Sequence, residues 1–180
     1  MTSPVPISDR FALLLGLSLG FALSRRQSRL MTAESCTGGM VSQWVTAIGG
    51  SSQWFDGAVV SYANVAKQHL LGVSSHSLEQ EGAVSEVVAR QMADGIRDQH
   101  CRLVTGSTTP LYGLSVTGIA GPQGGRPGKP VGLVWFGWSG PFGTDTQCRE
   151  FGGVRADIQR QAAAWAMSGL FARLCRPAIG

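Results

Sequence analysis

The chain has 180 residues, of which 43% are hydrophobic and 14% are charged, with a net charge of +4 and an isoelectric point near 9.2. These values are typical of one compact globular domain and exclude a disordered chain. The basic residues are scattered and form no Lys/Arg-rich tail, so the composition gives no indication of nucleic-acid binding.

The four cysteines are Cys36, Cys101, Cys148 and Cys175. They form no Cys-x-x-Cys pair, and no histidine stands at metal-ligand spacing from another histidine or a cysteine. We therefore expect a cytoplasmic protein with reduced thiols and no metal site.

We expect residues 1–8 to form a flexible N-terminal tail and residues 9–180 to form a single domain. A helix is predicted over 9–25, with Asp9 at its N-cap or in its first turn. The apolar stretch 11–23 is too short to span a membrane and is not followed by a small-residue cleavage site. It predicts a buried helix that packs on the sheet, and no membrane association.

A short strand over 29–33 is followed by a helical pattern over 38–48. Between them, Glu34, Ser35 and Thr37 stand where an α/β sheet places its ligands. Gly38 and Gly39 allow close backbone approach, and the first N–H groups of the helix favour an anion or a developing oxyanion. An ordinary N-cap would require the same residue types, so both interpretations stay open.

The apolar run 57–61 predicts a second strand that is buried on both faces. A helix over 64–71 follows, with Asn64 as its cap and Gly72 closing it. Lys67 would lie in the first turn, where the helix dipole and burial lower the pKa of an ammonium group. Such a lysine can act as general base toward a serine, with Tyr62 relaying the proton. The alternative is a solvated lysine on a surface helix.

Ser85 is expected to cap a helix that runs to Gln99, and a third strand is expected over 114–117. The segment 118–132 that follows is rich in glycine and proline. Its backbone N–H groups could hold an anion, with charge supplied by Arg126 and Lys129, or it could be an ordinary ordered turn.

Strands over 131–138 and 147–151 and a last helix over 154–174 complete the pattern. Since strands and helices alternate, the class is α/β with helices covering a central sheet. The three histidines, His69, His76 and His100, have no acidic partner at a telling spacing and are expected at the surface. Cys36 is read as a small buried residue.

Five segments resemble, in order and spacing, the CinA C-terminal domain family. They are Thr32–Gly39, Ser61–Lys67, Gly82–Glu86, Val116–Pro122 and Lys129–Gly132. The likeness runs from about residue 9 to residue 174.

The resemblance implies a three-layer α/β/α sandwich with a mixed, mostly parallel five-stranded sheet. It also implies amidohydrolysis of nicotinamide mononucleotide to nicotinate mononucleotide and ammonia, in the recycling of pyridine nucleotides such as NAD. No metal or cofactor is implied, and the protein is expected to be a homodimer or higher homo-oligomer. Longer members carry a further N-terminal domain that this sequence does not contain.

Carried onto this chain, the family's mechanism makes Ser35 the nucleophile and Lys67 its base, with Tyr62 assisting. The remaining candidates are expected around the substrate. They are Glu34, Thr37, Gly38, Gly39, Asn64, Thr117, Gly118, Gly121, Gly124, Gly125, Arg126 and Lys129. Among these, Glu34 is expected to orient the turn by hydrogen bonding.

The chain departs from the family in one place. Members commonly read Phe-x-Gly-Asp-Arg before the last helix, with another arginine four residues further on. Here Val154 replaces the aspartate and Gln159 the second arginine, while Arg155 is retained. Two other functions therefore stay open: a non-catalytic, competence- or damage-inducible interaction protein, and a module that binds pyridine nucleotides without hydrolysing them.

Overall fold

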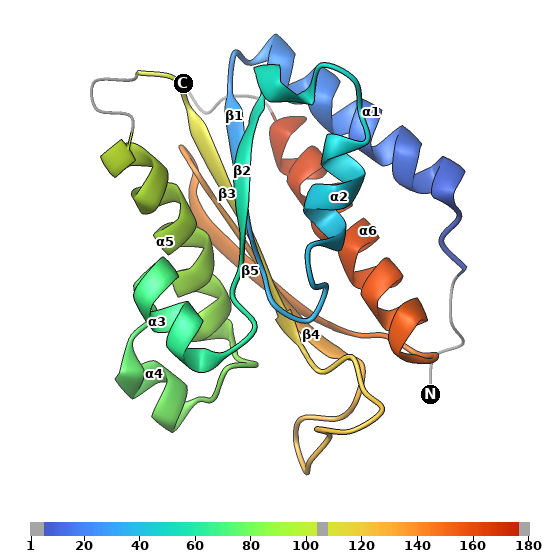
Figure 1. Ribbon diagram of the computed structural model, residues 1–180, viewed down its shortest axis with the longest axis vertical. Coiled ribbons are helices and arrows are strands. Elements are labelled where there is room, and N and C mark those ends of the chain that lie inside the picture. The colour runs from blue at the N-terminus through green and yellow to red at the C-terminus, as the bar shows by residue number, and fades with distance from the viewer. Residues whose placement is uncertain (1–5, 104–107, 177–180) are drawn as a thin grey trace.

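A five-stranded sheet forms the centre of the computed structural model, which describes residues 6–103 and 108–176 (Figure 1). The strands lie in the order β2-β1-β3-β4-β5. Their bounds are Arg29–Glu34 (β1), Phe55–Val60 (β2), Leu111–Gly118 (β3), Leu133–Gly140 (β4) and Gly143–Glu150 (β5). Strand β1 pairs in parallel with β2 and β3, whereas β4 pairs antiparallel with β3 and β5. All strands except β4 thus run in one direction, which confirms the mixed, mostly parallel sheet.

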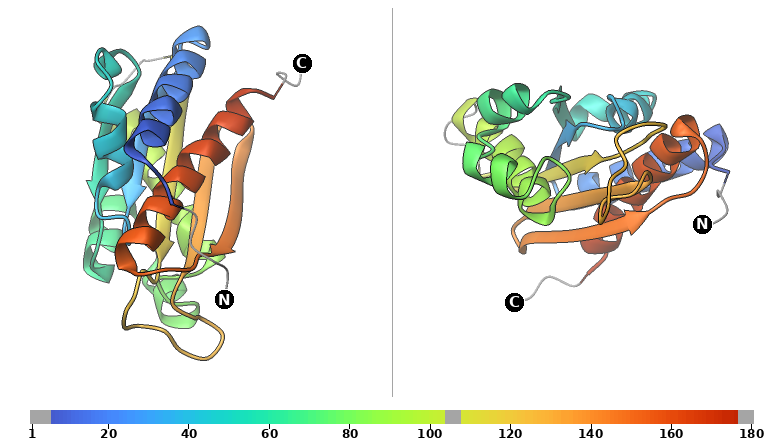
Figure 2. Two further views of the ribbon diagram at one scale, coloured as in Figure 1. Left: turned by 90° about the vertical axis from the view of Figure 1, so that its right-hand side faces the viewer. Right: turned by 90° about the horizontal axis from the view of Figure 1, so that it is seen from below.

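Helices cover both faces of this sheet (Figures 1 and 2). One face carries α1 (Asp9–Arg25), α2 (Met40–Thr46) and α6 (Arg155–Leu174). The other carries α3 (Asn64–Leu71), α4 (Ser75–Gln80) and α5 (Glu86–Leu103), and a short 3₁₀ turn (η1, Ser51–Gln53) precedes β2. The three-layer α/β/α sandwich is confirmed, although the sequence analysis did not predict α4.

A separate apolar cluster lies between the sheet and each of the two helix layers. Leu114, Phe136 and Trp138 face α1, α2 and α6, while Met92 and Ile96 of α5 lie in the cluster on the other face. Helix α5 lies very close to β3, since a Cβ at Gly113 would stand only 2.2 Å from the carbonyl oxygen of Ala93. This close approach fixes the middle of α5 against the first half of β3. At the end of β3, the hydroxyl of Thr117 donates to the carbonyl oxygen of Ala83 (2.7 Å) and so ties the strand to the loop before α5.

The prediction for α1 is only partly right. The helix begins where expected, with Ser8 as N-cap and Asp9 in the first turn, but it packs mainly on α6 and α2. Those two helices already cover the sheet, so α1 buries one side, including Leu19 and Leu23, and leaves an apolar stripe exposed. The stripe consists of Leu13, Leu14, Leu17 and Phe21.

The prediction that β2 is buried on both faces is wrong. The strand is at the edge of the sheet, where it pairs only with β1, and Val60 is 47% exposed. An apolar run cannot distinguish an edge strand from a central one, because both bury residues against a helix layer.

The prediction for His100 is also wrong, while His69 and His76 are exposed as expected. The ring of His100 is 15% exposed, and its Nε2 lies 3.1 Å from Oδ2 of Asp56, which also pairs with Arg29. The partner lies on β2, 44 positions away along the chain, so no local spacing could reveal it.

Element ends differ slightly elsewhere: β4 and β5 are shifted from 131–138 and 147–151, and α5 runs four residues past Gln99. Residues 1–5 of the expected tail lie outside the described ranges. Within those ranges, no helix combines the length and the apolar character that a membrane span requires.

Candidate active site

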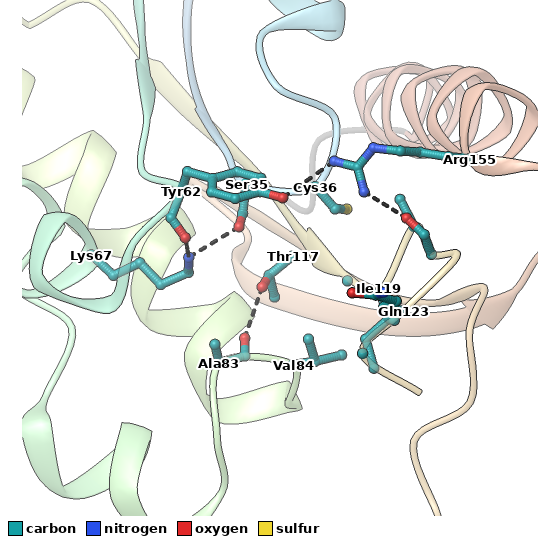
Figure 3. Close-up of a pocket in the computed structure, with 14 residues that line it drawn as sticks. Ser35, Cys36, Tyr62, Lys67, Ala83, Val84, Thr117, Ile119, Gln123 and Arg155 are labelled. Carbon is teal, nitrogen blue, oxygen red and sulfur yellow. Dashed lines mark hydrogen bonds between the residues drawn. The ribbon is translucent and has the colours of Figure 1, made fainter. Parts of the chain in front are cut away.

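The predicted site residues lie at the carboxyl ends of three adjacent strands. Ser35 follows β1, Tyr62 follows β2, and Thr117 and Gly118 end β3. Because these strands are parallel, their carboxyl ends meet at one edge of the sheet (Figure 3).

A buried hydrogen bond joins Ser35 to Lys67. The ammonium nitrogen Nζ of Lys67 lies 3.0 Å from Oγ of Ser35 and also donates to the carbonyl oxygens of Ser61 (2.6 Å) and Tyr62 (3.2 Å). Lys67 is only 1% exposed and stands in the first turn of α3. The N-cap of α3 is Ala63, without a side-chain cap, so Asn64 is the first helical residue and not the cap.

Burial changes the acidity of two titratable neighbours of Ser35, Lys67 and Cys36. It lowers the pKa of Lys67 to about 8, and the nearby thiol of Cys36 opposes this shift. It raises the pKa of Cys36 itself to about 12, so that thiol stays protonated at neutral pH. Cys36 is 4% exposed, which agrees with its prediction as a small buried residue.

Glu34 is fully buried and caps α2 from the end of β1. Its carboxylate accepts five hydrogen bonds, from the N–H groups of Gly39, Val41 and Ser42 and from the hydroxyls of Thr37 and Ser42. Gly39 is the N-cap in left-handed conformation (φ 99°) and has no side chain to perform this role. Glu34 therefore fixes the turn that carries Ser35, and three helix N–H groups are no longer open to a ligand.

Most other N–H groups of the turn also have acceptors. Those of Gly38 and Met40 donate to the carbonyl oxygens of Ser35 and Thr37. In residues 35–42, all of them described, the N–H groups of Cys36 and Thr37 are the two without an acceptor.

A pocket of about 230 Å³ opens beside Ser35. Its lining includes seven of the predicted residues: Ser35, Tyr62, Lys67, Thr117, Gly118, Gly121 and Gly124. The sequence analysis missed or set aside the others, which are Cys36, Ala83, Val84, Ile119, Ala120, Gln123 and Arg155. Most of these offer only backbone or apolar atoms, which carry no recognisable pattern in a sequence.

Eight predicted residues do not line this pocket: Glu34, Thr37, Gly38, Gly39, Asn64, Gly125, Arg126 and Lys129. Lys129 instead donates to the carbonyl oxygens of Glu81 and Val84. It also closes a small hairpin with Arg126 through two backbone hydrogen bonds of 2.9 Å. This lysine thus ties the loop between β3 and β4 to the segment before α5.

Arg155 is the main residue that the sequence analysis missed. One of its nitrogens donates to the carbonyl oxygen of Gly121 (2.8 Å) and another to the hydroxyl of Tyr62 (3.2 Å). Figure 3 shows these contacts reaching from the start of α6 to both sides of the pocket. The signal that could have found it was its retention in the otherwise altered segment before the last helix.

Val154 and Gln159, which the sequence analysis singled out, lie at the start of α6. Val154 is the N-cap of α6, where a valine has no oxygen to accept from the helix N–H groups. Gln159 lies one turn further on, and its Nε2 donates to the carbonyl oxygen of Cys36 at 2.8 Å. The described residues contain no cluster of three or more metal-ligating side chains.

Comparison with known proteins places the chain in a family. The model of the CinA C-terminal domain matches residues 15–174. The chain is 44% identical over 154 residues to the nicotinamide-nucleotide amidohydrolase PncC of Enterobacter agglomerans, covering 85% of this chain and 89% of that protein. It is 52% identical over 128 residues to a CinA-like protein of Acaryochloris marina, covering 71% of this chain but only 29% of that longer protein.

A solved structure agrees with the sequence matches. The competence damage-inducible protein A of Klebsiella pneumoniae superposes with a TM-score of 0.82 at 33% identity, covering 92% of this chain and 98% of that one. The match spans both helix layers and the sheet, and the family model includes every element of the pocket. The chain therefore belongs to the CinA C-terminal domain family.

Proposed function

We propose that this chain is an amidohydrolase that converts nicotinamide mononucleotide to nicotinate mononucleotide and ammonia, with Ser35 as nucleophile and Lys67 as base. The observation that carries the proposal is the buried contact of 3.0 Å between Nζ of Lys67 and Oγ of Ser35. The name of the relative from Enterobacter agglomerans supplies the substrate.

The surroundings of Lys67 suit a neutral amine. A neutral amine has two N–H groups and one lone pair, whereas an ammonium has three N–H groups. The carbonyl oxygens of Ser61 and Tyr62 take two N–H groups, which leaves the lone pair for the hydroxyl of Ser35. With the pKa of Lys67 lowered to about 8, a sizeable fraction is neutral near neutral pH.

Each chemical step then has a named group. Oγ of Ser35 attacks the carboxamide carbon while Nζ of Lys67 takes the hydroxyl proton, and the oxyanion accepts a hydrogen bond from the N–H of Thr37. Lys67 passes the proton to the departing nitrogen, which leaves as ammonia. Water then attacks the acyl-enzyme with Lys67 again as base, releasing the carboxylate and restoring Ser35.

The pocket rim supplies groups for the rest of the nucleotide. The ring of Tyr62 is a flat surface for the positively charged pyridinium. Arg155 is a cation at the opening that suits the phosphate, and Lys129 is already occupied by carbonyl oxygens. Because the pocket is small, we assign it to the pyridinium carboxamide, with ribose and phosphate outside.

The decisive experiment measures ammonia released from nicotinamide mononucleotide by the purified protein and its Ser35→Ala variant. We expect release from the former and a loss of at least ~10³-fold in the variant, because the acyl-enzyme cannot form. Ser24→Ala, an exposed serine of α1, is the matched control and should keep full activity.

Two outcomes would contradict the proposal. Full activity in Ser35→Ala would show that Ser35 is not the nucleophile. Binding of the nucleotide without turnover by the unaltered protein would favour the binding module, and neither binding nor turnover would favour an interaction protein.

The proposal also includes a cytoplasmic location and a homodimer or higher homo-oligomer. The four cysteines are free thiols, as expected of a reducing compartment. The exposed stripe on α1 gives a second copy an apolar surface to cover. Sedimentation of the purified protein measures the oligomeric state.

A further inference from the structure

One side chain of α6 that lies outside the pocket contacts the backbone of the turn after β1, the turn that carries Ser35. The amide of Gln159 donates to the carbonyl oxygen of Cys36, and no other donor from the described residues reaches that oxygen. The two residues are 123 positions apart, so this bond joins the start of α6 to the turn after β1.

The geometry of the peptide group carries this contact to the next residue. The carbonyl of Cys36 and the N–H of Thr37 belong to one planar trans peptide, in which they point in opposite directions. A hydrogen bond that fixes the carbonyl toward α6 therefore fixes the N–H of Thr37 away from α6. That N–H is one of two donors of the turn, with the N–H of Cys36, that have no acceptor in the described part of the chain.

Helix α6 is a firm support for this bond. Ile158 and Ala162, on either side of Gln159, are buried in the core, and Arg155 one turn earlier holds Gly121. The hydrogen bond also polarises the peptide, which makes its N–H a better donor.

We propose that Gln159 is a positioning residue: it orients the Cys36–Thr37 peptide so that the N–H of Thr37 stabilises the oxyanion formed on attack by Ser35. This inference rests on the proposed function. It assigns a role to the amide of Gln159, and an arginine at this position could fill the same role because both side chains can donate to a carbonyl oxygen.

The test compares three variants at this position. Gln159→Met keeps the length and removes the donor, Gln159→Glu keeps the shape and turns an acceptor toward the carbonyl, and Gln159→Arg restores a donor. We expect kcat for nicotinamide mononucleotide to fall about 10- to 100-fold in the first two variants, with KM changed less than about threefold. Gln159→Arg should recover most of the lost rate.

The pH profile separates this role from damage to the base. Gln159 does not touch Lys67, so the midpoint of the rate profile should stay unchanged while the maximum falls. A kcat within twofold of the unaltered protein in both Gln159→Met and Gln159→Glu would overturn the inference. A rise in KM alone, or a loss that Gln159→Arg does not restore, would overturn it too.

A second readout does not depend on the substrate. A fluorophosphonate reacts with nucleophilic serines and places its phosphoryl oxygen where the oxyanion would lie, and mass spectrometry measures its attachment to Ser35. We expect the rate of attachment to fall in Gln159→Met and recover in Gln159→Arg. If the unaltered protein makes no ammonia but this dependence holds, the proposed substrate is wrong and the role of Gln159 stands. Equal rates in all variants would overturn the role.

Discussion

The chain contains only two lysines, and they occupy contrasting places. Both donate to two backbone carbonyl oxygens, Lys67 at the end of β2 and Lys129 in the loop between β3 and β4. Burial lowers the pKa of each, with Arg126 adding to the effect at Lys129. Only Lys67, however, also has a serine hydroxyl beside Nζ.

The comparison teaches that a lowered pKa alone does not identify a base. Lys129 is half-exposed, and its described contacts are carbonyl oxygens, which have no proton to give. The bonds of Lys129 hold a loop, whereas Nζ of Lys67 also lies 3.0 Å from the hydroxyl oxygen of Ser35, the proposed nucleophile. The partner atoms decide the role.

The strongest test of the difference between Lys67 and Lys129 is to remove each ammonium group in turn. Lys67→Met should lower kcat/KM for nicotinamide mononucleotide by about 10²- to 10⁴-fold, because general base catalysis is lost. Lys129→Met should lower it less than about tenfold, since the loop loosens while Ser35 and its base remain. Equal losses in steady-state assays of the two variants would refute the distinction.

The pH dependence of the rate tests the assignment of Lys67 as the general base. Lys67 must be neutral to accept a proton, so kcat/KM should rise with pH through a midpoint near its pKa of about 8. Below that pH the rate should fall about tenfold per pH unit. Lys129→Met should leave the midpoint in place, and a shift by a full unit in that variant would show that the wrong lysine had been named.

The stability of the fold should depend on pH through Lys67. Its pKa is about 8 in the folded protein and near the ordinary 10.5 in the unfolded chain. Between these values only the unfolded chain holds the proton, so raising the pH favours the folded state. Relative to Lys67→Met, the free energy of unfolding should be constant below pH 8 and should increase from pH 8 to pH 10. Urea titrations at pH 7, 9 and 10 measure this difference, and a decrease over that range would contradict it.

The smallest expected effect is that of Lys129→Met on the stability of the fold. Loss of the hydrogen bonds to Glu81 and Val84 should lower the free energy of unfolding by about 1 kcal/mol, a modest value because the group is half-exposed. Thermal unfolding at pH 7 checks this value, and Arg126→Met serves as a neighbouring control without those two bonds. A more stable Lys129→Met protein would mean that the bonds do not hold the loop.

The sequence predicted much of the fold and the central pair of the site. The sequence places Ser35 on the turn after the first strand and Lys67 in the helix that follows the second, and the parallel pairing of β1 with β2 brings the two side chains together. The pattern of alternating strands and helices fixed the class. It did not show that β2 is an edge strand or that α1 lies outside α2 and α6, because those features depend on strand order and helix packing.

Long-range contacts account for most of what was missed. Arg155 reaches Tyr62 across 93 positions and His100 reaches Asp56 from another layer, and neither spacing carries a local signal. Lys129 was predicted near the substrate from its glycine-rich surroundings, but charge and flexibility alone could not reveal that carbonyl oxygens of the chain already occupy it.

The buried carboxylate of Glu34 has a consequence for how nucleotides are recognised. In many α/β folds, the start of the helix after the first strand binds the phosphate of a nucleotide. Here the protein's own carboxylate occupies that position and accepts hydrogen bonds from the N–H groups of Gly39, Val41 and Ser42. Those three N–H groups are therefore not open to an external anion, and the same strand-turn-helix unit instead carries Ser35, the proposed nucleophile, at the pocket. Under the proposed function, the nucleotide therefore enters the pocket with its base first.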